Sequence, residues 1–71
     1  MADTMLWELR KDGRETKCLI RSQAGQFEIA VVYEGLRMQS RLCPLKGEAL
    51  LLAKEERGKW ESFGWLAPTA A

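Results

Sequence analysis

Two cysteines are the side chains best suited to covalent chemistry in this sequence, Cys18 and Cys43. Cys43 stands directly before Pro44, where a helix is expected to begin, and a helix N-terminus favours the thiolate form of cysteine. A nucleophilic thiolate also needs a base, but the sequence contains no histidine and no obvious substitute for one. We therefore interpret Cys43 as a small buried hydrophobic residue at the end of a strand, and we expect no enzyme activity.

Carboxylates and metal ligands give no stronger indication of chemistry. Glu55 and Glu56 are neighbours on the expected helix, where consecutive side chains point about 100° apart and do not converge on one site. The sequence has no phosphate-binding glycine loop, no nucleophile elbow and no metal-ligand spacing. Two isolated cysteines cannot supply the four ligands of a structural zinc ion, except across a dimer. We expect no catalytic residue, no cofactor and no metal.

The charge balance argues against a strongly basic nucleic-acid-binding surface. Eleven Lys and Arg residues face ten Asp and Glu residues, for a net charge of +1, whereas proteins that hold nucleic acid non-specifically usually have a clear basic excess. The start of the chain has no basic region followed by an apolar run. The longest apolar runs, 29–33 and 49–53, are far shorter than the roughly 20 residues of a membrane span. We expect a cytoplasmic protein with free thiols and no membrane partner.

Turn dipeptides divide the first 42 residues into four runs rich in strand-forming residues. The turn signals are Asp12-Gly13, Ala24-Gly25 and Glu34-Gly35. The runs are 5–11, 14–22, 27–33 and 36–42. Because each turn is short, the strands are predicted to pair in sequence order as an antiparallel meander. This order separates the strands of Cys18 and Cys43 by one intervening strand, roughly 9–10 Å, so no disulfide between them is expected.

A common register gives all three hairpins the same apolar face. Two-residue turns at both ends and a four-residue loop over 23–26 place Trp7 opposite Cys18, Ile20 opposite Ile29 and Arg21 opposite Glu28. Extended to the strand ends, this register also pairs Leu6 with Leu19, Met5 with Ile20, Val31 with Met38, Ile29 with Ser40, Phe27 with Leu42, Ala30 with Gln39 and Glu28 with Arg41.

The last segment, from Pro44 to about Phe63, has helical spacing instead of alternation. Its expected buried stripe consists of Leu45, Ala49, Leu52, Glu56, Trp60 and Phe63. Gly64 is suited to a left-handed C-cap, after which Trp65 folds back over the last turn. The helix is expected to cross the apolar face of the sheet, giving a two-layer α+β domain of order ββββα. Residues 1–71 form one domain in this prediction, with an ordered core over about 4–66 and flexible ends.

Apolar side chains that this arrangement leaves outside the core predict a protein–protein interface. The candidate interface residues are Leu6, Leu19, Ala30 and Val32 on the outer face of the sheet, and Leu50 and Leu51 on the helix. A contiguous exposed apolar set is typical of an interaction surface, and small domains often bind a copy of themselves. The partner is expected to be another protein or the same chain in a homodimer. The edge strands offer a further route to pairing.

A nucleic-acid interface is the alternative function. The outer face of the predicted sheet carries Arg10, Lys17, Arg21, Arg37 and Arg41, and a sheet with exposed arginines can contact DNA from a groove. The order of strands followed by one helix, over the second to fourth predicted strands and the helix, resembles the DNA-binding domains of plant ethylene-response factors and the arm-binding domains of phage integrases. This resemblance implies DNA contact through the sheet. Glutamates on the same face would neutralise these cations, so a salt-bridged solvent face also stays open.

A second resemblance concerns the two ends of the fold. The sequence opens with Trp-x-Leu-Arg-x-Asp-Gly over 7–13 and closes with Gly64-Trp65 after a helix of mixed charge. In this respect it resembles small bacterial proteins, which implies a bacterial origin and assigns no site. Trp7 and Trp65 are predicted to lie in the core and over the helix end.

Overall fold

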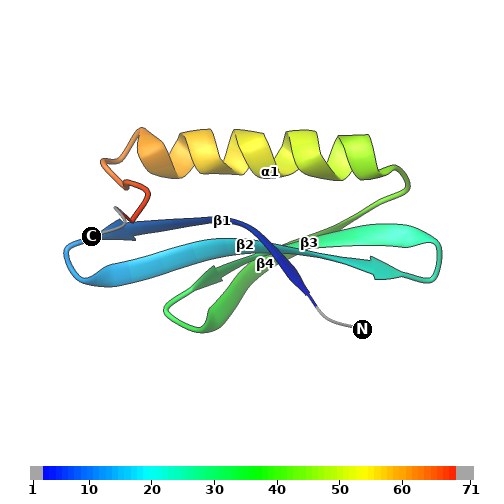
Figure 1. Cartoon of the computed structure of the whole chain (residues 1–71), viewed down its shortest axis with the longest axis horizontal. Coiled ribbons are helices and arrows are strands. Elements are labelled where there is room, and N and C mark those ends of the chain that lie inside the picture. The colour runs from blue at the N-terminus through cyan, green and yellow to red at the C-terminus, as the bar shows by residue number, and fades with distance from the viewer. Residues whose placement is uncertain (1–2, 69–71) are drawn as a thin grey trace.

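A computed structural model describes residues 3–68 and confirms the predicted ββββα architecture. Its elements are β1 Thr4–Lys11, β2 Arg14–Gln23, β3 Gln26–Tyr33, β4 Leu36–Cys43 and α1 Lys46–Glu61. The strands form one antiparallel sheet in the order β1-β2-β3-β4, and α1 lies across one face of this twisted sheet (Figure 1). The ends that were expected to be flexible include residues 1–2 and 69–71, which lie outside the described residues.

Each of the three hairpins has a two-residue turn in which both residues have positive φ. The middle turn is Ala24-Gly25, with φ of 49° and 79°, and such pairs of left-handed residues match the twist of the adjoining strands. The four-residue loop predicted over 23–26 is wrong, because Gln23 and Gln26 pair across this turn. The added pair leaves the rest of the register unchanged, so Ile20 lies opposite Ile29 as predicted.

A bulge at Leu6 changes the predicted register at the start of β1. Trp7 lies opposite Cys18 as predicted, but Met5 lies opposite Leu19, so the predicted pairs Leu6–Leu19 and Met5–Ile20 are wrong. The extra residue of a bulge shifts the alternation of side chains by one, so Met5, which precedes the bulge, lies on the face opposite to the one predicted. Leu6 thereby packs against the core, while Met5 is 52% exposed.

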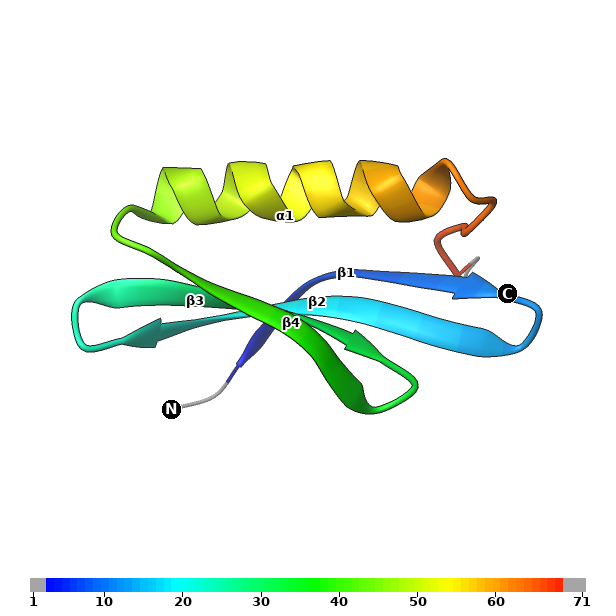
Figure 2. The ribbon, with the colours of Figure 1, turned by 180° about the vertical axis from the view of Figure 1, so that it is seen from behind.

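A second bulge, at Met38, changes the faces of β4. The pairs nearest the turn follow the prediction, but beyond Met38 residues Val31, Ile29 and Phe27 lie opposite Gln39, Arg41 and Cys43. The predicted pairs of Val31 with Met38, Ile29 with Ser40, Phe27 with Leu42, Ala30 with Gln39 and Glu28 with Arg41 are therefore wrong. The bulge brings Cys43 into the core next to the loop that leads to α1, and it turns Leu42 to the outer face. In Figure 2, β4 is the edge strand in front of the sheet.

The helix approaches the sheet through two alanines. Ala49 and Ala53 are 0% and 2% exposed, and their small side chains let the backbone of α1 come close to the strands. Trp7 of β1 packs in the same core cluster as these two alanines. Its indole Nε1 donates a buried hydrogen bond of 2.9 Å to the carbonyl oxygen of Ala53. Two residues of the predicted stripe, Leu45 and Phe63, are exposed instead, because α1 begins at Lys46 and ends at Glu61.

The Trp7 contact predicts a large loss of stability on substitution. Trp7→Phe removes the hydrogen bond to Ala53 and leaves a cavity beneath α1, so the free energy of unfolding should fall by about 2–4 kcal/mol. Urea denaturation followed by circular dichroism measures this change. Phe63→Leu is the matched control, since Phe63 is exposed, and its effect should stay within about 0.5 kcal/mol. Equal effects of the two variants would show that the Trp7 contact does not anchor the helix.

Candidate interaction surface

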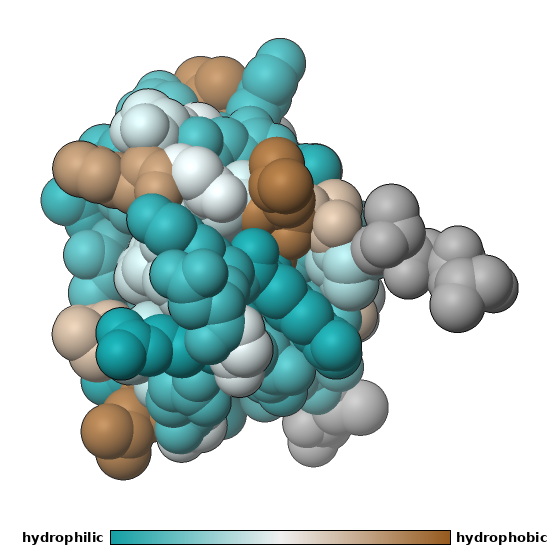
Figure 3. Space-filling view, turned by 90° about the vertical axis from the view of Figure 1, so that its left-hand side faces the viewer, coloured by the Kyte–Doolittle hydropathy of each residue, from teal (hydrophilic) through white to brown (hydrophobic). Residues whose placement is uncertain are grey.

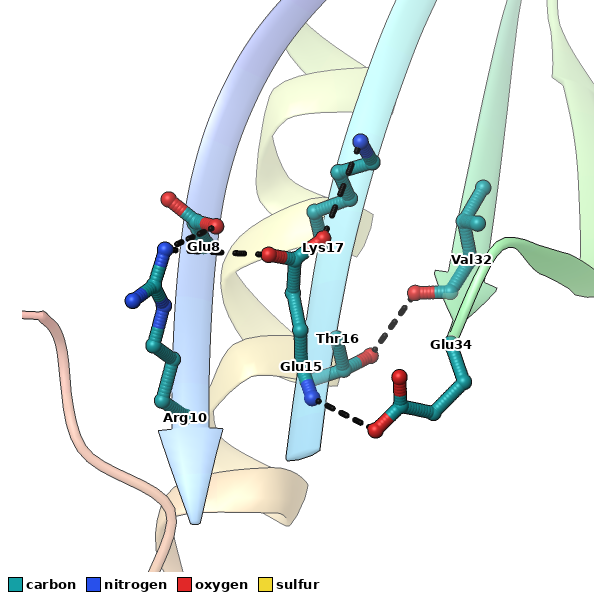
Figure 4. Close-up of polar contacts among 7 residues, drawn as sticks. All are labelled: Glu8, Arg10, Glu15, Thr16, Lys17, Val32 and Glu34. Carbon is teal, nitrogen blue, oxygen red and sulfur yellow. Dashed lines mark hydrogen bonds and ion pairs between the residues drawn. The ribbon is translucent and has the colours of Figure 1, made fainter. Parts of the chain in front are cut away.

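The basic residues of the outer face are held in ion pairs with carboxylates. Arg10 lies 3.4 Å from Glu8 and 3.7 Å from Glu15, and Lys17 lies 3.8 Å from Glu15 (Figure 4). The Arg10–Glu15 contact joins opposite positions of β1 and β2, while the other two contacts each lie within one strand. Each exposed pair adds little stability, but together the pairs place two carboxylates beside the two cations on this part of the outer face.

The remaining predicted nucleic-acid contacts separate into two groups. Glu28 of β3 lies between two arginines, at 2.6 Å from Arg21 and 3.8 Å from Arg37. Arg41 was predicted on the same face, and this placement is wrong, because the bulge at Met38 sets Arg41 opposite Ile29 on the side of α1. Four of the five proposed cations therefore share the outer face with three carboxylates, and the fifth points to the other layer.

The apolar stripe predicted on the outer face is mostly covered. Ala30 is 4% exposed, Leu19 and Val32 are half-buried, and Leu6 belongs to the core side. The predicted stripe is therefore not a contiguous exposed surface. The two helix residues of the predicted interface differ from it, because Leu50 and Leu51 are exposed.

Exposed apolar side chains occur instead along β4, an edge strand whose apolar residues the sequence analysis did not include in the predicted interface. Every residue from Leu36 to Leu42 is exposed, and the fractions reach 68% for Leu36, 61% for Met38 and 57% for Leu42. By comparison, the end of the molecule with the β1–β2 turn is mostly hydrophilic, with isolated hydrophobic residues (Figure 3). The sequence signal that could have indicated β4 is its apolar content in a strand at the edge of the meander.

The two edges of the sheet differ in whether their outward-facing backbone N–H and C=O groups form hydrogen bonds. On the free side of β1, Arg10 N donates to Leu66 O at 2.7 Å and Leu66 N donates to Arg10 O at 3.1 Å. The segment after α1 thus caps part of this edge. Within residues 3–68, no strand or loop forms backbone hydrogen bonds to the far side of β4. The edge of β4 is therefore available for pairing with another strand.

A cavity of about 320 Å³ opens beside β4, between the sheet and α1. Its lining residues are Gln39, Glu56, Lys59, Trp60 and Phe63. Gln39 and Glu56 also line a smaller neighbouring pocket together with Arg41 and Leu52. Glu56 accepts a hydrogen bond of 3.3 Å from Lys59, whereas Arg41 has no carboxylate within ion-pair distance among residues 3–68.

Aromatic rings give this cavity a packed wall. Trp60 stacks on Tyr33, with ring centroids 6.0 Å apart, and meets Trp65 edge-to-face at 5.0 Å. Trp65 is 8% exposed and folds back toward the helix end, as predicted, with its backbone N–H donating to the backbone carbonyl oxygen of Trp60. Gly64 permits this reversal through its positive φ of 92°.

Neither cysteine is placed for nucleophilic chemistry. Cys18 and Cys43 are both buried free thiols. Burial raises the pKa of Cys18 to about 11, with a further contribution from the charge of Glu56, so this thiol stays protonated at neutral pH. In the part of the chain that the structure describes, no three His, Cys, Asp or Glu residues gather into a metal-binding group.

The raised pKa of Cys18 predicts a loss of stability in alkali. The folded state binds this proton more tightly than the unfolded state does, so its stabilising contribution is complete below pH 9 and is lost as pH rises toward 11. The loss from this group should be about 2 kcal/mol. Urea unfolding at pH 8 and pH 11 measures it, and Cys18→Ala, although less stable throughout, should show a smaller fall. Identical falls in both proteins would contradict the assignment.

Comparison of the chain with protein-family models, curated proteins and solved structures finds no match. In residues 3–68 no helix is both long and apolar enough to cross a membrane.

Proposed function

We propose that this chain is a non-catalytic protein-contact domain that associates with a second copy of itself through the edge of β4. The observation that carries the proposal is the contrast between the two sheet edges. Leu66 caps the β1 edge in part, at Arg10, whereas β4 combines an unpaired backbone edge with exposed Leu36, Met38 and Leu42.

The combination of backbone and side-chain exposure is what supports pairing at this edge. Proteins usually protect an edge strand by shortening it, covering it or placing charges on it. β4 runs over eight residues, and one of its two arginines, Arg37, is drawn toward Glu28. A strand added at this edge would cover exposed apolar side chains of β4. Because a domain of this size buries only a small core, this additional burial would contribute to its stability.

We also propose that the domain works in a reducing compartment, such as the bacterial cytoplasm. Its support is the pair of buried unlinked thiols, Cys18 and Cys43, since secreted domains of this size are usually stabilised by disulfides.

Self-association is tested by sedimentation equilibrium over micromolar concentrations. The wild-type chain should be a dimer, and Leu42→Lys, which puts a charge on the outer side of β4, should shift it toward a monomer of 8.1 kDa. Leu51→Lys is the matched control, because Leu51 is equally exposed but lies on the helix. It should leave the dimer unchanged.

Two outcomes of this experiment would reject the proposal. A wild-type chain that stays monomeric over the whole range rules out self-association. A dimer that Leu51→Lys dissociates and Leu42→Lys does not would place the contact on the helix, at the surface predicted from Leu50 and Leu51.

Nucleic-acid binding by the outer face is the alternative proposal. The ion pairs of Arg10, Lys17, Arg21 and Arg37 with glutamates give it less support. We expect no mobility shift of duplex DNA at low salt, where phosphate contacts are strongest. A shift that weakens with added salt and is reduced in Lys17→Gln would favour the alternative, and Lys54→Gln on the helix is the control for a general loss of charge.

A further inference from the structure

The regular part of β4 limits how two copies can pair. From Gln39 to Cys43 the strand pairs with β3 without interruption, and residues directly opposite each other in an antiparallel pair lie on the same face. Gln39 and Arg41 lie on the helix side, opposite Val31 and Ile29, while Ser40 and Leu42 lie on the outer side. A symmetric pair of β4 strands must match these faces around a two-fold axis.

Three positions of the axis are unfavourable. An axis at Gln39 sets Arg41 against Arg37 of the second copy, which combines like charges with side chains of opposite faces. An axis at Arg41 sets this arginine against itself. An axis at Leu42 leaves only residues 41–43 paired, since β4 ends at Cys43.

An axis at Ser40 avoids these conflicts. It places Ser40 opposite Ser40 of the second copy, two small neutral side chains on the outer face. Gln39 then lies opposite Arg41 of the second copy on the helix side, with matching faces, and the paired segment runs from Met38 to Leu42. Leu42 lies opposite Met38 of the second copy, so two exposed apolar side chains come together.

This register also provides a partner for the unpaired arginine. Gln39 shares both neighbouring cavities with Glu56, so Arg41 of the second copy, opposite Gln39, lies at the rim of the space that holds the Glu56 carboxylate. Glu56 is 14% exposed and is bonded to Lys59, whose side chain is 69% exposed and can give way. A carboxylate has several acceptor sites, so it can bind an arginine in addition to the lysine.

Resting on the proposed self-association, we infer that two copies join antiparallel through β4 with Ser40 on the two-fold axis. Each Arg41 then enters the cavity of the other copy beside Glu56. The contact would make one continuous sheet from the two domains, with both helices on the same face.

Disulfide trapping tests the position of the axis. Ser40→Cys should form a covalent dimer within minutes of mild oxidation, because facing residues of an antiparallel pair have Cα atoms about 4.5–5.5 Å apart, within disulfide range. Ser22→Cys is the matched control, since Ser22 is an exposed serine of a strand away from β4. It should crosslink slowly, by collision. The wild-type chain, with both native thiols buried, sets the background.

A charge exchange tests the Arg41–Glu56 contact. Arg41→Glu and Glu56→Arg should each raise the Kd of dimerisation about tenfold, and the double variant should recover most of the loss. Glu55→Arg, at an exposed neighbouring position of α1, should leave the Kd unchanged. A double variant as weak as the product of the single effects would reject the contact.

The results separate the inference from the proposal on which it rests. A wild-type chain that stays monomeric would reject both the proposed self-association and the Ser40 axis. A wild-type dimer in which Ser40→Cys crosslinks no faster than Ser22→Cys defeats the Ser40 axis and leaves the proposed self-association standing.

Discussion

One helix has to cover a sheet of four strands, and the rest of the structure depends on this mismatch of widths. An α-helix with its side chains is about 10–12 Å across, whereas the outer strands of such a sheet lie about 14 Å apart before their own side chains are counted. The Ala49–Ala53 contact and the Trp7 hydrogen bond fix α1 close to the sheet. With the helix held there, Gln39 and Arg41 on the helix side of β4 stay exposed.

The polar character of β4 on the helix side follows from the same mismatch. Gln39 and Arg41 face the layer of α1 but lie beside the helix, where water reaches them. An arginine beneath the centre of the helix would have to be desolvated, which is costly without a partner. The bulge at Met38 therefore places polar residues where coverage ends and puts Cys43 in the core.

The sequence predicted the order of elements because the turn dipeptides and the alternation of Phe27, Ile29, Val31 and Tyr33 agree on one topology. It did not predict the bulges, since neither Leu6 nor Met38 has a glycine or proline beside it to indicate an irregular strand. In β4 the error reversed the faces of Arg41 and Leu42, because a slip of one residue exchanges the two sides of a strand. Exposure on the helix side of β4 could not be predicted either, because it depends on where the helix lies.

The hydrogen bonds between Arg10 and Leu66 also bear on how large an assembly of this chain can grow. A sheet with two open edges can add neighbours without end, as fibrils do. In this molecule the segment after α1 occupies part of the β1 edge, at Arg10. In the proposed dimer, a symmetric contact at β4 would use the other edge in both copies at once. The segment after α1 would then help to limit the assembly to two copies.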